Sequence, residues 1–122
     1  MNETYSSAGK TTIAIDVLLA IARLTALNVP GVSRLVTPAG VKGIFKRSHH
    51  QDGVSILVED DTVNADLFLT LKNDYNILEV CHKVQHDVAR AISEMVGMQV
   101  GRIDVQVEDI DYTVESTEPS DE

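Results

Sequence analysis

The stretch from Val63 to Leu71 constrains the fold of this chain more than any other, because every second residue in it is apolar. Val63, Ala65, Leu67, Leu69 and Leu71 alternate with Asn64, Asp66, Phe68 and Thr70. Successive side chains of a strand point to opposite faces, so this pattern predicts a strand with one face in a hydrophobic core. The segment 54–58 alternates in the same way, and the polar link 59–62 predicts that the two strands form an antiparallel hairpin.

A long amphipathic helix is predicted after this hairpin, from about Ile77 to Val96. Asn76 is followed three residues later by Glu79, which is the signature of a capped helix start, and Gly97 supplies the left-handed residue that ends many helices. One face of this helix is apolar and is predicted to pack on the sheet: Ile77, Val80, Cys81, Val84, Val88, Ala91, Ile92 and Met95.

The remaining elements are predicted from shorter patterns. They are a strand at 13–15, a helix at 17–27 capped by Asp16 and ended by Pro30-Gly31, weak strands at 32–36 and 41–45, and a last strand from 103 toward 112. This order predicts one small α+β domain, residues 10–113, with a mixed or antiparallel sheet of about four to five strands and two helices on one face. Residues 1–9 and the acidic residues 114–122 are predicted to be flexible tails.

Composition supports a single folded domain. The chain has 122 residues, of which 43% are apolar and 24% charged, so we expect one hydrophobic core. Its single cysteine, Cys81, allows no intramolecular disulfide, and the first residues lack the pattern of a secretory signal. The apolar run 17–22 is far shorter than a membrane-spanning helix. We therefore expect a cytoplasmic protein that reaches a membrane only peripherally.

Charge is distributed unevenly along the chain. The formal net charge of −9 disfavours general binding to nucleic acid or anionic lipid. Residues 17–51 nevertheless contain no acid, and this segment holds Lys42, Lys46 and Arg47. Lys42 is part of the sequence Gly40-Val41-Lys42-Gly43. That GxxG pattern occurs in KH loops, although a KH loop joins two helices and this one does not. A nucleic-acid-binding module that uses the basic loop Lys42–Arg47 is therefore the alternative hypothesis for function.

Candidate catalytic and metal-binding residues are few. His82 and His86 are four residues apart, a spacing that some metal sites use, but they share the helix face of Glu79, Lys83 and Asp87, which is typical of a solvated surface. The chain has no nucleophile motif and no glycine-rich phosphate loop. We predict no catalytic, cofactor-binding or metal-binding residues, and therefore a protein that is not an enzyme.

The predicted helix at 17–27 is unusual because it is apolar nearly all round. Leu19, Ala22 and Ala26 lie away from the face that Val17, Ile21 and Leu24 form. A helix of this kind is expected to be buried all round. Either the loop 37–47 covers it, or part of it contacts another chain. The interaction surface predicted for the second case comprises Leu19, Arg23, Ala26 and Leu27, with Lys42, Lys46 and Arg47 as a basic second part.

Several short motifs, taken in order, resemble a known family. They are Asp16-Val17-Leu18, Val29-Pro30-Gly31-Val32, Gly53-Val54, the segment 76–80, Val84-Gln85, the segment 88–97 and Val105-Gln106-Val107. In order and spacing they are similar to the alkaline shock protein family of bacterial envelope stress response proteins. The resemblance implies a non-enzymatic cytoplasmic protein linked to cell-envelope homeostasis, prone to self-association and held near the membrane by a membrane-anchored partner.

Overall fold

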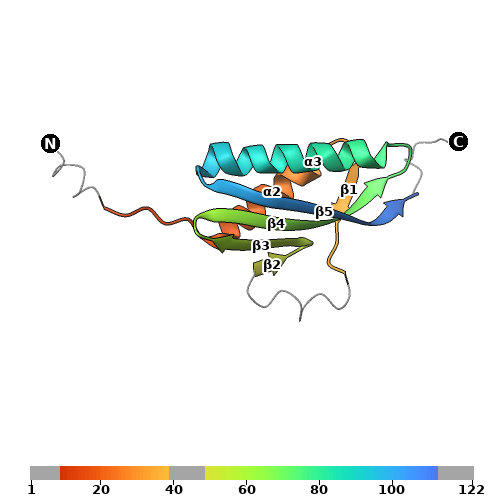
Figure 1. The fold of residues 1–122 in the computed structure, drawn as a ribbon. Helices are drawn as coiled ribbons and strands as arrows, with labels where there is room; N and C mark the ends of the chain where they lie inside the picture. Colours follow the sequence, from red (N-terminus) through yellow and green to blue (C-terminus); the bar gives the residue numbers. More distant parts are fainter. Residues whose placement is uncertain (1–8, 39–48, 113–122) are drawn as a thin grey trace, which may run out of the picture.

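The computed structural model describes residues 9–38 and 49–112, which form a five-stranded sheet and two main helices (Figure 1). The elements in chain order are α2 (Ile15–Leu27), β1 (Val32–Leu35), β2 (His49–Gln51), β3 (Val54–Glu59), β4 (Thr62–Lys72), α3 (Ile77–Ala91), the π-helical turn η1 (Ile92–Val96) and β5 (Gln99–Asp111). The predicted single α+β domain with a mixed sheet is confirmed.

Strand β4 lies at the centre of the sheet and organises it. Along one edge it pairs with β5 in parallel, over its whole length. Along the other edge it pairs antiparallel with two strands in succession, first β3 and then β1. The two strands β1 and β3 therefore lie end to end on the same edge of β4. The short strand β2 extends the sheet beyond β3.

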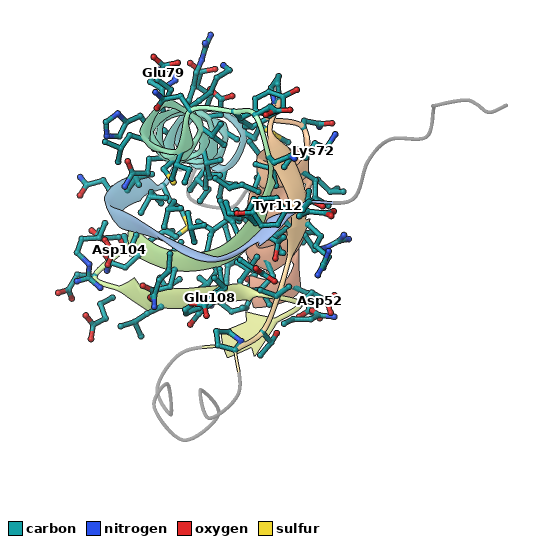
Figure 2. The ribbon with its side chains drawn as sticks, turned by 90° about the vertical axis from the view of Figure 1, so that its right-hand side faces the viewer. Asp52, Lys72, Glu79, Asp104, Glu108 and Tyr112 are labelled. Carbon is teal, nitrogen blue, oxygen red and sulfur yellow. The ribbon has the colours of Figure 1, made fainter. Side chains whose placement is uncertain are left out.

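The hydrophobic core lies between the sheet and the two helices. The odd-numbered residues of β4 from Val63 to Leu71 are fully buried, as their alternation predicts. They share one cluster with Val84 and Val88 of α3 and with Ala22 of α2. Figure 2 shows Asp104 on the side of the sheet away from α2, and Glu79 on the outward side of α3. The two helices thus cover one face of the sheet.

The predicted ends of the second helix and the predicted hairpin are confirmed. The Asn76 side chain accepts a hydrogen bond of 3.0 Å from the Glu79 backbone N–H, and Gly97 ends the helix in the left-handed conformation with φ 79°. Asp60 and Asp61, at the tip of the β3–β4 hairpin, both have positive φ. Two such residues give the turn a twist that matches its flanking strands.

Three local predictions need correction. Residues 13 and 14 are not in a strand, and α2 begins at Ile15 with Ala14 as N-cap, so Asp16 lies inside the first turn instead of capping it. Strand β2 is not among the predicted strands, and it pairs with β3 through a turn in which Asp52 and Gly53 have positive φ. Strand β5 begins at Gln99, four residues earlier than predicted. The strand predicted at 41–45 lies outside the described residues, as do most of the two predicted tails.

Candidate interaction surface

Helix α2 buries one face and exposes another that is also apolar. Leu18, Leu19, Ala22 and Ala26 are buried against the sheet and α3. On the opposite side Val17 is 46% exposed, Leu24 52% and Leu27 36%, with Ala20 half-buried between them. We call the four residues Val17, Ala20, Leu24 and Leu27 the α2 stripe. Its spacing of three and four residues keeps it on one side of the helix.

The predicted contact residues on this helix are therefore wrong in part. Leu19 is 5% exposed and Ala26 is fully buried, so neither is available to another chain. The reason lies in the polar residues of the helix. Asp16, Arg23 and Thr25 lie on or beside the outward side, while the arc from Leu18 through Ala22 to Ala26 contains no polar residue. That arc, with two small alanines, packs closely in the core, and Leu27 is the predicted contact residue that stays on the exposed stripe.

The stripe has one charged flank. Asp16 and Arg23 line a hollow of about 140 Å³ together with Leu19, Ala20, Gln51 and Asp52. Figure 2 shows Asp52 on the α2 side of the molecule, at the turn between β2 and β3. Among the described residues, neither Asp16 nor Arg23 has an ion-pair partner. On this flank α2 itself thus presents one acid and one base beside the apolar stripe, and Asp52 adds a second acid to the hollow.

A second hollow lies where the end of α2 meets the start of α3. It has a volume of about 180 Å³ and is lined by Val29, Pro30, Tyr75, Asn76, Glu79, Val80 and Lys83. Pockets that hold small-molecule ligands usually measure about 300–1,000 Å³. Both hollows are smaller than that, and each has room for a side chain of a partner protein.

The structure does not test the basic part of the predicted interaction surface, and the two histidines lie on α3. Lys42, Lys46 and Arg47 lie outside the described residues, so the nucleic-acid hypothesis stays a prediction. His82 and His86 lie on the exposed face of α3, where His86 Nδ1 is 3.2 Å from Asp87 Oδ1. Hydrogen bonds from His86 and Lys83 lower the pKa of Asp87.

The described residues offer no arrangement for metal or thiol chemistry. They contain no group of three or more His, Cys, Asp or Glu side chains that could hold a metal ion. Cys81 is half-buried on α3, and burial raises the pKa of its thiol, which disfavours the reactive thiolate. Cys81 is therefore a small packing residue, as its position on the helix predicts.

The fold defines the class of protein first: it is a single α+β domain. Its candidate site among the described residues is an exposed helix face. Residues 3–112 match the alkaline shock protein 23 family, which is described by a cell envelope-related function, and the chain belongs to that family. The resemblance in the sequence motifs is thereby confirmed. No helix in the described part of the chain is long and apolar enough to span a membrane.

This chain is similar to known proteins both in its sequence and in its structure. YqhY of Bacillus subtilis, an uncharacterized protein, is 24% identical over 120 residues, which cover 97% of this chain and 89% of YqhY. The structure is similar to the MamM CTD in its copper form, with a TM-score of 0.58 and 14% identity over 88% of this chain and 96% of that one. A variant of the same domain gives a TM-score of 0.53 and 16% identity, over 78% and 94% of the two chains. At such low identity these likenesses concern the fold alone.

Proposed function

We propose that the protein is a non-enzymatic assembly module that works at the cytoplasmic face of the cell envelope. It acts through self-association and through a membrane-anchored protein partner. The observation that carries the proposal is the α2 stripe, because Val17, Leu24 and Leu27 expose large apolar side chains in a row on one helix. Exposed apolar rows of this kind mark protein contacts more often than single exposed leucines do.

The described part of the surface supports binding over catalysis. The two hollows are too small for a substrate of ordinary size, and the described residues hold no metal-ligand cluster. The family description, a cell envelope-related function, supports the envelope as the place of action. A partner that spans the membrane would connect the chain to that place, since no described helix can do so.

Self-association is tested with two matched leucine variants. Leu24 on the stripe is 52% exposed and Leu78 at the start of α3 is 68% exposed, so glutamate at either position leaves the core intact. Light scattering after size exclusion, over a range of concentrations, should give an oligomer for the wild type and for Leu78→Glu. Leu24→Glu should give the 13.3 kDa monomer. An oligomer unchanged in Leu24→Glu would contradict a role of the stripe.

The membrane-anchored partner is tested by binding to membranes. The purified protein should not bind vesicles of anionic lipid, because its net charge is −9. It should bind native envelope membranes, and protease treatment of those membranes before mixing should remove the binding. Equal binding to lipid vesicles and to native membranes would contradict a protein partner.

A further inference from the structure

We propose that two copies of this chain dimerise through antiparallel packing of their α2 helices, with a two-fold axis at Ala20. In this arrangement Asp16 of one copy lies beside the partner's Arg23, and the same pair forms again on the other side of the axis. The inference rests on the proposed function, because it specifies the geometry of the self-association that the α2 stripe supports.

The spacing of the stripe is symmetric about Ala20. Val17 lies three residues before Ala20 and Leu24 lies four after it. When two α2 helices run in opposite directions and cross at Ala20, Val17 of each helix lies opposite Leu24 of the other, at nearly the same position along the helix axis. A small residue at the crossing allows the axes to approach within about 8–10 Å. The apolar side chains on both sides of Ala20 then cover each other.

The charged flank selects the antiparallel orientation. Asp16 and Arg23 are seven residues apart, nearly two turns, so they lie within about 20° of each other around the helix. They lie on the same flank of the stripe. The opposite flank carries Ile21, Thr25 and Asn28, which have no charge. In an antiparallel pair related by a two-fold axis, each flank of the helix lies beside the same flank of the partner helix, and the two helices run in opposite directions. Asp16 therefore meets the partner's Arg23, whereas a parallel pair would place each charge against the uncharged flank.

The two charges are available for such contacts. Neither has an ion-pair partner among the described residues, and both line the hollow beside Ala20. The other long helix provides a contrast. On α3 two pairs of opposite charges are already formed within the chain, with 3.2 Å between Lys83 Nζ and Asp87 Oδ2 and 3.1 Å between Arg90 Nε and Glu94 Oε2. The unpaired acid and base on α2 complement a second copy of the same surface.

Charge reversal tests the pairing. Asp16→Lys places a lysine beside the partner's Arg23, and Arg23→Glu places two acids together, so each variant alone should dimerise at least about tenfold more weakly than the wild type. An equimolar mixture of the two variants should restore the affinity to within about threefold, because the mixed dimer regains two attractive pairs. Sedimentation equilibrium measures the dissociation constants. Far-ultraviolet circular dichroism of each variant checks that α2 still folds.

Cysteine crosslinking tests the orientation independently of charge. In a Cys81→Ser background, Ala20→Cys lies on the two-fold axis, so two copies should crosslink by a disulfide or a short bismaleimide. Leu27→Cys is the matched control, because two copies of that residue lie about 21 Å apart along the helix axes in the antiparallel dimer. Only Ala20→Cys should crosslink. A parallel dimer would crosslink at both positions.

The outcomes separate this inference from the proposed function. A wild type that stays monomeric at all concentrations removes both. If Leu24→Glu abolishes self-association, the assembly function stands. The antiparallel geometry is then overturned if the mixture of charge variants does not recover the dimer affinity, or if Leu27→Cys crosslinks. Recovery in the mixture together with crosslinking at Ala20→Cys alone supports the antiparallel dimer.

Discussion

Gly53 and Val36 lie so close together that a Cβ atom on Gly53 would be 2.7 Å from both the backbone nitrogen and the backbone oxygen of Val36. The contact is the point where β1 and β3 meet end to end along β4. Phe68 of β4 marks the change of partner, since its N–H donates to the Gly53 carbonyl and its carbonyl accepts from the Val36 N–H, both at 2.9 Å. The Gly53 N–H in turn donates to Thr37 Oγ1 at 3.0 Å.

Gly53→Ala should therefore destabilise the protein by about 2 kcal/mol or more, because the new methyl group meets backbone that cannot rotate away and the residue has φ 81°. Gly97→Ala is the matched control. Gly97 has nearly the same φ, 79°, but among the described residues nothing beyond its own neighbours in the chain lies within 4 Å of the added Cβ, so Gly97→Ala should lose only about 1 kcal/mol. Urea unfolding measures both free energies. Equal losses in the two variants would mean that the contact with Val36 has no energetic weight.

Alanine substitutions of Leu19 and of Leu24 should lower the free energy of unfolding by very different amounts, although both residues lie on the same helix. Leu19 is 5% exposed, and Leu19→Ala should cost about 3 kcal/mol through lost burial and a cavity. Leu24 is 52% exposed, and Leu24→Ala should change the free energy of unfolding of the monomer by less than about 0.5 kcal/mol. The measurement is urea unfolding at a concentration where both variants are monomers. A reversed order would mean that the helix presents the other face to the core.

Thr70→Val should stabilise the protein by about 1 kcal/mol. The Thr70 side chain is 1% exposed, and its hydroxyl finds no hydrogen-bond partner among the described residues. Replacing an unsatisfied buried hydroxyl with a methyl group of similar size removes its desolvation penalty. Thr62→Val is the control. The Thr62 hydroxyl is exposed, so this variant should gain no stability. Thermal unfolding followed by circular dichroism gives the comparison, and a loss of stability in Thr70→Val would reveal a partner for that hydroxyl.

Asp66→Asn should stabilise the protein slightly at about pH 7, by a few tenths of a kcal/mol, since the site is partly exposed. Burial and then the nearby Asp104 raise the pKa of Asp66, with Arg102 opposing them. A raised pKa in the folded state means that ionisation of Asp66 destabilises the fold. Stability contributed by this group is present in acid and is lost as the pH rises from about 3.8 through the raised pKa.

The advantage of Asp66→Asn over the wild type should therefore shrink as the pH falls. Urea unfolding of both proteins between about pH 3 and about pH 8 measures the difference. A gap that widens in acid would contradict the sign of the pKa shift.

Much of the fold follows from local patterns. The alternation in β4, the Asn76 cap and Gly97 predicted a strand and a helix that the structure has at those places. Strand β2 was missed because three residues carry too short a pattern, although the Asp52-Gly53 turn was a signal for a hairpin. The predicted contact surface on α2 included Leu19 and Ala26, which are buried. The absence of any polar residue from the arc through Ala22 was the better signal.

The sequence by itself determined the main helices and strands, the single core and the family, because hydrophobic period, helix caps and turn residues act over a few neighbours along the chain. Only the tertiary structure decided that β1 and β3 share one edge of β4, and which apolar face of α2 stays exposed. Both depend on contacts between residues far apart in the chain. A helix with only three polar residues has a weak local preference for one side. The space left by the sheet and α3 therefore decides that the alanine-rich face packs in the core while Val17, Leu24 and Leu27 stay exposed.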